Sequence, residues 1–206
     1  MTMPQTLLLE LNHRVKNNFQ IIVSLMNLKM RMLPPDKRED IRFLQEHVQS
    51  MAVAVRLVYA TDEMGEVSVG ELLGEVVSEL RQIARLRAGQ IYLTGADLSE
   101  ALGLDDAIAF GLYLAVLLPP YMDQARVSGQ QMTVSASVEG GLLTLSIAGG
   151  SGQPIALDVL RTRLSDAYVR QLHGEAMPPT EQSDARFRLP IARPRRSPVH
   201  AVVVGA

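Results

Sequence analysis

The residues most able to do chemistry lie near the start of the chain, in the run Glu10-Leu11-Asn12-His13-Arg14-Val15-Lys16-Asn17-Asn18-Phe19-Gln20. Histidine can act as a nucleophile near neutral pH, and an exposed imidazole with one free nitrogen can attack a phosphoryl group in line. Arg14 and Lys16 would offset the charge of an incoming phosphate, and Asn17, one helical turn after His13, would hydrogen-bond the imidazole or a phosphate oxygen. These residue types are compatible with a phosphate carrier at His13, but their spacing alone favours an ordinary exposed histidine on a solvated helix face.

The element that must position His13 is a long amphipathic helix. Apolar residues recur every three or four positions and form one helical stripe, made of Leu7, Leu11, Val15, Phe19, Ile22, Met26, Met30 and Leu33. At about 100° per residue, His13 lies about 200° from Leu11 and points away from this stripe. A polar stripe continues from His13 through Asn17, Gln20, Ser24, Asn27 and Arg31. The other histidines, His47, His173 and His200, lack such neighbours and are interpreted as ordinary surface or helix-end residues.

A second helix follows a break at Leu33-Pro34-Pro35-Asp36, because two prolines cannot continue a helix and Asp36 can cap the next one. Its apolar stripe comprises Ile41, Leu44, Val48, Met51, Val55 and Val58. Residues from about 4 to 60 therefore predict an antiparallel helical hairpin. Two helices alone cannot bury both stripes and their apolar flanks, which favours a homodimer with a four-helix bundle. The alternative is that the hairpin packs on the rest of its own chain.

The second half of the chain has a mixed pattern of helices and strands. Three helices are predicted, over 69–86, from Asp105 or Asp106 through Leu118, and over 157–172. The second of these is expected to end at Pro119-Pro120. Strands are predicted over 91–94, 132–138, 142–148 and 186–191, the middle two forming a hairpin through Glu139-Gly140-Gly141. The fold class is α+β, with a helical hairpin at 1–62, a layered helix-and-sheet domain at 67–192 and a flexible tail at 193–206.

Composition narrows the function classes. The 206 residues carry a net charge of only −2, which gives no electrostatic case for binding nucleic acid. The chain has no cysteine, which excludes disulfides and thiolate metal sites and fits a reducing cytoplasm. No apolar run of membrane-spanning length and no signal peptide is recognised, so we expect a cytoplasmic protein without a membrane partner.

The segment His13-Arg14-Val15-Lys16-Asn17-Asn18-Phe19-Gln20 resembles the phosphoacceptor motif of sensor histidine kinases of the H-R-x-K-N-N type, which are related to the HWE kinases. Such kinases have a dimerisation and histidine-phosphotransfer hairpin followed by an ATP-binding domain of the Bergerat (GHKL ATPase-like) type. The order of elements over about residues 7–190 is similar to theirs. The resemblance implies that His13 is the phosphoacceptor.

The chain departs from this family where ATP should bind. The family helix carries an N-E-L-x-x-N-A signature for magnesium, and Ala115-Val116-Leu117-Leu118-Pro119-Pro120-Tyr121 stands there without asparagine or acid. In the next box, D-x-G-x-G, Ala148 replaces the aspartate that recognises adenine. Gly149, Gly150 and Gly152 could form a phosphate loop, but a turn after a strand is favoured. The glycine-rich segment before the last helix is also missing. These losses predict a degenerate domain that binds no nucleotide cofactor and no metal.

The architecture resembles that of ChpT-type histidine phosphotransferases. This resemblance implies that His13 passes a phosphoryl group between aspartates of response-regulator receivers, with Mg²⁺ supplied by the receiver and an upstream sensor kinase or hybrid-kinase receiver as the phosphate source. Apolar residues near His13, such as Leu9, would contribute to receiver docking. Two alternatives remain open: a divergent kinase that autophosphorylates His13 from ATP, and a non-catalytic dimeric adaptor for response regulators.

Overall fold

The computed structural model describes residues 5–60, 65–149 and 155–191, and within these ranges it leaves out the side chains of residues 5–14, 16, 36 and 88. The predicted tail at 193–206 lies outside the described residues. The helices are α1 (Gln5–Met32), α2 (Arg38–Ala60), α3 (Val69–Ile83), α4 (Leu104–Ser128) and α5 (Val159–Gln171), with short 3₁₀ turns η1 (Pro35–Lys37) and η2 (Ala88–Gln90). The strands are β1 (Glu66–Ser68), β2 (Ile91–Thr94), β3 (Ala101–Gly103), β4 (Met132–Glu139), β5 (Leu142–Ala148), β6 (Glu175–Met177) and β7 (Ala185–Pro190).

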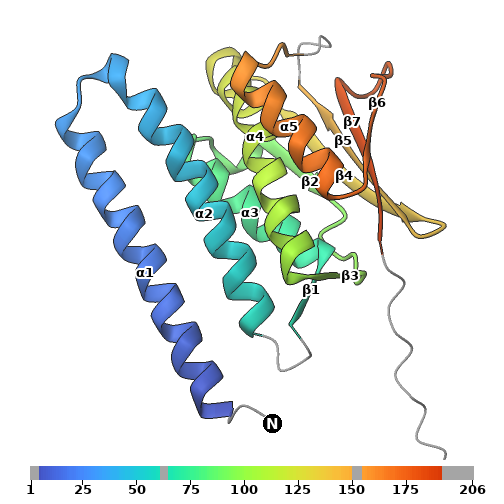
Figure 1. Cartoon of the computed structure of the whole chain (residues 1–206). Helices are drawn as coiled ribbons and strands as arrows, with labels where there is room; N and C mark the ends of the chain where they lie inside the picture. Colours follow the sequence, from blue (N-terminus) through green and yellow to red (C-terminus); the bar gives the residue numbers. More distant parts are fainter. Residues whose placement is uncertain (1–4, 61–64, 150–154, 192–206) are drawn as a thin grey trace, which may run out of the picture.

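The predicted helical hairpin is confirmed, with α1 and α2 joined by the double-proline turn (Figure 1). Among the described side chains of the predicted α1 stripe one position differs, because Ile22 is 41% exposed and Val23 is half-buried in its place. Leu7 and Leu11 of that stripe lie outside the described side chains. An ideal helix places residues 22 and 23 on either side of the stripe formed by Val15, Phe19, Met26 and Met30, each about 50° from its centre, so spacing alone cannot choose between them.

The buried face of α2 is different from the predicted stripe. Leu44 is 48% exposed, whereas the buried residues are Gln45, Glu46, Ser50, Val53, Ala54, Leu57 and Val58. This face packs against α4 and α3, which lie beside α2 in Figure 1. At the crossing with α4, a Cβ on Gly111 would lie 3.2 Å from the carbonyl oxygen of Ser50, so the two backbones approach closely. The second helix of the hairpin therefore packs on the rest of its own chain.

Helix α4 does not end at Pro119-Pro120, as predicted, but continues through both prolines to Ser128. The apolar partners around it outweigh the two lost backbone hydrogen bonds, since most of its residues from Ala107 to Ala125 are buried. Among the described helices, α4 alone is long and apolar enough to cross a membrane, so the expectation that no segment reaches this length is wrong. Because 67% of its most apolar window is buried inside the fold, its setting is that of a core helix.

The main sheet has five strands in the order β2-β4-β5-β7-β6, with β2 parallel to β4 and the other neighbours antiparallel. The predicted β4–β5 hairpin is confirmed, and its turn uses Gly140 and Gly141 at φ +61° and +81°, where residues other than glycine are disfavoured. One sheet face is covered by helices (Figure 1). At this interface Tyr113 of α4 contacts Phe187 of β7, with ring centroids 4.4 Å apart. The short strands β1, β3 and β6, with three residues each, were not predicted, because three residues carry too little periodicity.

Candidate functional site

Positions 13, 14, 16 and 17 all lie within the uninterrupted helix α1. The side chains of His13, Arg14 and Lys16 lie outside the described part of the chain, so their predicted roles stay predictions. Asn17 is described and exposed, one helical turn after position 13. The rest of the predicted polar stripe is exposed as well, at Gln20, Ser24, Asn27 and Arg31.

A second, apolar surface of α1 is exposed to solvent. It consists of Ile21, Leu25, Leu28 and Met32, spaced four, three and four residues apart, with Ile22 beside them. Since α1 packs chiefly on α2, this stripe faces no partner within the described fold. Its spacing is that of a helix seam, and such a surface usually marks an interaction site.

The stretch that the resemblance aligns with the magnesium signature, residues 115–121, lies inside α4, and an arginine from α5 donates hydrogen bonds to two of its carbonyl oxygens. Pro119 and Pro120 have no N–H, so the carbonyl oxygens of Ala115 and Val116, four residues earlier, lose their helical donors. The guanidinium of Arg161 occupies this position, with Nη1 3.3 Å from the Ala115 oxygen and 3.1 Å from the Val116 oxygen. Sequence reasoning missed Arg161, although two prolines inside a core helix signal two buried acceptors that need a donor.

Arg161 is held in place by its own element and by α2. Asp158 caps α5 by accepting a hydrogen bond from the Arg161 backbone N–H at 2.8 Å. The Arg161 side chain is 8% exposed, and its Nη2 lies 3.4 Å from Oε2 of the buried Glu46. The guanidinium also lies over the ring of Phe43, 5.0 Å from its centroid. A single side chain thus joins α5, α4 and α2.

Glu46 has a second cationic partner on its own helix. Arg42 Nε donates to Glu46 Oε1 at 2.9 Å, and Arg42 also pairs with Asp123 of α4. Burial raises the pKa of Glu46, and both guanidiniums oppose that rise. Burial lowers the pKa of Arg42, but the hydrogen bonds and charges of Asp123 and Glu46 outweigh it, so the net shift is upward. We call Arg42, Glu46, Asp123 and Arg161 the interhelix network.

His47 lies beside this network and is half-buried, so its interpretation as an ordinary surface residue is wrong. Its Nδ1 is 2.8 Å from the Phe43 carbonyl oxygen, and its ring contacts that of Phe43 at 4.2 Å. Burial lowers the pKa of His47; the Phe43 hydrogen bond opposes this, and the charge of Arg161 adds to it. His173 is exposed just after α5, as expected for a helix end, and His200 lies outside the described residues.

At the end of β5, the glycine predicted to begin a loop has a specific partner. The Gly149 N–H donates to Oδ2 of Asp184 at 2.5 Å, and both residues are buried. A Cβ on Gly149 would lie 3.0 Å from Cδ1 of Tyr121 and 3.1 Å from Oε1 of Gln124, so this backbone is tightly enclosed. Gly150 and Gly152 lie outside the described residues. Sequence reasoning missed Asp184, because no pattern links it to β5.

Among the described residues, no group of three or more histidine, aspartate or glutamate side chains is arranged to hold a metal ion. The stretch around Pro119 and Pro120 offers two carbonyl oxygens, and the guanidinium of Arg161 occupies both. A fixed positive charge at this position opposes Mg²⁺, which prefers free oxygen ligands. The residues present therefore do not fit a magnesium–nucleotide complex at this stretch.

Residues 10–84 match the HisKA_2 family, described as histidine kinase. This segment comprises most of the hairpin, together with β1 and α3, and is similar to that family of histidine kinases. The match extends over less than half of the chain. No curated protein sequence matches the chain closely enough to count as a relative.

Two solved structures show the same overall fold. The blue-light activated histidine kinase EL346 of Erythrobacter litoralis is similar with a TM-score of 0.56 and 20% identity, over 93% of this chain and 65% of that one. The histidine kinase domain of the same protein gives a TM-score of 0.52 and 20% identity, over 89% of this chain and 92% of that one. The chain thus spans slightly less than two thirds of the solved chain of the light-activated kinase. A helical hairpin followed by a mixed α/β domain resembling a histidine kinase catalytic domain is confirmed.

Proposed function

We propose that the chain is a histidine phosphotransferase, which moves phosphoryl groups between receiver aspartates through His13 and uses no ATP of its own. The observation that carries this proposal is the pair of α4 carbonyls freed by Pro119 and Pro120 and bound by Arg161. Where the resemblance places a magnesium signature, this chain has a proline pair and a buried guanidinium. Such a position repels a divalent cation instead of binding one.

The interhelix network supports the same proposal from another side. A kinase must bring its nucleotide to the histidine of the hairpin, which requires the two parts to change their relative position. Here α2 is joined to the second half by the half-buried pair of Arg42 with Asp123 and by the buried pair of Glu46 with Arg161. Separating the two parts would break both pairs together with the contact between α2 and α4, so the network opposes such a movement.

In the proposed reaction, a phosphorylated receiver docks on the hairpin and one imidazole nitrogen of His13 attacks the phosphorus in line. The N–P bond forms while the O–P bond to the receiver aspartate breaks, and the aspartate leaves as a carboxylate. Transfer to a second receiver is the reverse of this step. Arg14 and Lys16 would offset phosphate charge and Asn17 would orient the imidazole, while the receiver supplies Mg²⁺.

The exposed apolar stripe of α1 supports homodimerisation as part of this proposal. Ile21, Leu25, Leu28 and Met32 lie away from the α2 contact and have the spacing of a helix seam. A second copy of the hairpin would cover them in a four-helix bundle. We propose a cytoplasmic location on the grounds of cysteine usage alone.

The test is a labelling assay with the purified chain. It is incubated with labelled ATP alone and, separately, with a receiver phosphorylated in advance. We expect label on the chain only in the second case, and none in His13→Ala, while the exposed His173→Ala variant behaves like the parent chain.

The other outcomes identify the alternatives. Label from ATP alone would show a divergent kinase and overturn the proposal. Receiver binding without any label, unchanged in His13→Ala, would show a non-catalytic adaptor.

A further inference from the structure

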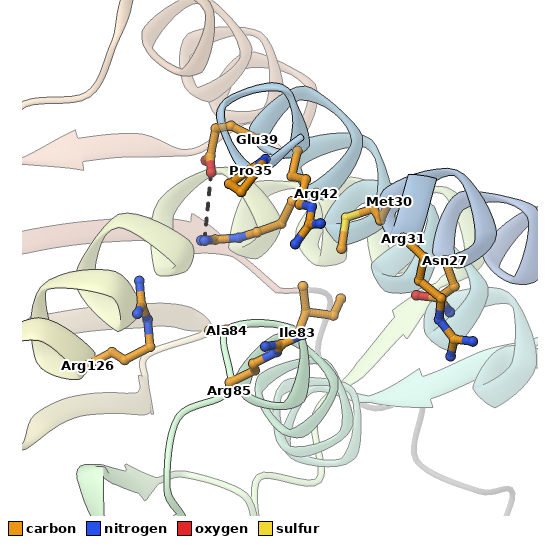
Figure 2. Close-up of a pocket in the computed structure, with 11 residues that line it drawn as sticks. Asn27, Met30, Arg31, Pro35, Glu39, Arg42, Ile83, Ala84, Arg85 and Arg126 are labelled. Atoms are coloured by element: carbon orange, nitrogen blue, oxygen red, sulfur yellow. Dashed lines mark ion pairs between the residues drawn. The ribbon is translucent and has the colours of Figure 1, made fainter. Parts of the chain in front are cut away.

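A cleft of about 580 Å³ lies at the turn end of the hairpin, where α1 and α2 meet the ends of α3 and α4 (Figure 2). Five arginines line it, together with a single carboxylate, that of Glu39: Arg31, Arg38, Arg42, Arg85 and Arg126. The whole chain has a net charge of −2 and 20 basic residues, so a quarter of its cations converge on this one cleft. We call it the arginine cleft.

Three of these guanidiniums have no carboxylate partner within the described part of the chain. Arg42 is satisfied by Glu39, Glu46 and Asp123, and Arg126 lies 3.3 Å from Asp123. Arg38 donates Nε to the Leu33 carbonyl at 2.9 Å, which leaves its charge uncompensated. Arg31 and Arg85, described and exposed, make no ion pair with another described residue. The cleft therefore keeps a surplus of positive charge that an anion can neutralise.

The backbone at Arg85 gives an independent reason to regard the cleft as a binding site. Arg85 follows α3 with φ +56°, a left-handed conformation that helix ends usually assign to glycine or asparagine. Its N–H donates to the Gln82 carbonyl at 3.1 Å, and the next N–H reaches Arg81 at 3.0 Å, which fixes this conformation. The chain thus holds an arginine at a position where a smaller residue would be less strained, and its side chain lines the cleft (Figure 2).

Helix dipoles explain only part of this arrangement. Arg31 and Arg126 lie in the last turns of α1 and α4, where the helix dipole favours a cation. That effect acts on each helix separately and does not require the side chains to share one cavity. It also does not account for Arg38 and Arg42, which belong to the first turns of α2, where a cation is disfavoured.

We propose that the arginine cleft binds an oligophosphate, an anion with two or more linked phosphoryl groups, carried by a nucleotide or free. Guanidinium groups bind phosphate in a bidentate geometry, and the volume lies within the range of about 300–1,000 Å³ found for small-molecule sites. Met30, Pro35, Ile83 and Ala84 supply an apolar wall beside the arginines, against which a nucleobase could pack.

Such a ligand would bridge the hairpin and the second half of the chain. Arg31 and Arg38 come from the hairpin, and Arg85 and Arg126 from the ends of α3 and α4. Its binding would therefore stabilise the contact between the two parts, next to the interhelix network that shares Arg42. The site lies about 18 residues, or roughly 27 Å of helix, from position 13, so this proposal does not depend on phosphate transfer at His13.

The test is calorimetric titration of the full chain with tripolyphosphate and, separately, with ATP, at low and at moderate salt. Arg31→Gln combined with Arg85→Asn removes two of the three uncompensated charges, and asparagine suits the left-handed backbone at position 85. Arg163→Gln, on the exposed side of α5, is the matched control. We expect tripolyphosphate to bind and to raise the melting temperature, the double variant to weaken binding tenfold or more, and the control to stay within twofold.

The two ligands identify the source of the phosphate chain. Tighter binding of ATP than of tripolyphosphate, with the same loss in the double variant, assigns the site to a nucleotide. Equal or weaker binding of ATP assigns it to a free phosphate chain. The proposal is overturned if neither ligand binds with a Kd below about 1 mM, a bound of the order expected for a physiological ligand. It is also overturned if the double variant, shown to be folded by circular dichroism, binds tripolyphosphate as tightly as the parent chain.

Discussion

Replacing Arg161 with methionine tests whether the interhelix network and the double proline of α4 depend on each other. Methionine keeps much of the aliphatic length but removes the guanidinium from the Ala115 and Val116 carbonyls and from Glu46. An acceptor left buried without a donor costs about 1–3 kcal/mol, and breaking one side of a buried ion pair about 3–5 kcal/mol. These costs overlap at one side chain, and Arg42 still pairs with Glu46, so we expect a total loss of about 3–5 kcal/mol in the free energy of unfolding.

The assay is urea unfolding followed by circular dichroism, with thermal unfolding beside it. For a chain of this size, each kcal/mol corresponds to roughly 2–4 °C, so the melting temperature should fall by about 6–20 °C. Arg163→Met, two residues further along α5 and exposed, should stay within about 0.5 kcal/mol. The double variant Glu46→Gln with Arg161→Met leaves no buried carboxylate behind, and should lose about 1–3 kcal/mol less than the sum of its two single variants. A loss below about 1 kcal/mol in Arg161→Met, or strict additivity in the double variant, would refute the reasoning.

Three further predictions concern the prolines, the buried histidine and the exposed stripe. Changing Pro119 and Pro120 to alanine restores two backbone N–H groups, so in an Arg161→Met background it should recover about 1–2 kcal/mol of the free energy of unfolding, measured by urea unfolding. No recovery would mean that the Ala115 and Val116 carbonyls are not the acceptors that Arg161 satisfies. Because burial lowers the pKa of His47, the unfolded chain binds a proton at this histidine at a higher pH than the folded chain does, and the free energy of unfolding should fall as the pH drops below about 6.5. The variant His47→Gln should flatten this pH dependence between about pH 7.5 and 5.5. An unchanged slope in the variant would contradict the prediction. Leu25→Glu places a charge in the exposed apolar stripe of α1 and should convert a dimer to a monomer in sedimentation velocity runs. The control Ser24→Glu, on the polar stripe, should leave the dimer intact. A parent chain that sediments as a monomer would exclude the dimer.

Local patterns in the sequence were sufficient for most elements of the fold. The two helices of the hairpin follow from apolar spacing and from Pro34-Pro35, and the β4–β5 hairpin follows from alternation around Gly140 and Gly141. These features depend on neighbours within a few residues, which is why a single sequence is enough to predict them. The short strands β1, β3 and β6 depend on distant partners instead.

Helix α4 shows where local reasoning failed. Two prolines predict a helix end, and in isolation each would cost about 3 kcal/mol or more. In the fold, the surrounding apolar residues keep the helix intact and Arg161, more than 40 positions away in the chain, replaces the missing donors. No spacing rule connects Pro119 with Arg161, because the link exists only after α5 packs on α4.

The sequence by itself determined the helix that contains His13 and the polar stripe that continues from it, since both depend only on residue types at helical spacing. It also determined that no asparagine and no acid occurs between positions 115 and 121, where the resemblance places the magnesium signature. Only the tertiary structure decided which face of α2 is buried, since Glu46 and Ser50 become interior residues through contact with α4 and α5. It alone gathered Arg31, Arg38 and Arg85 into one cleft, because these residues are brought together by helix packing and by the left-handed backbone at Arg85.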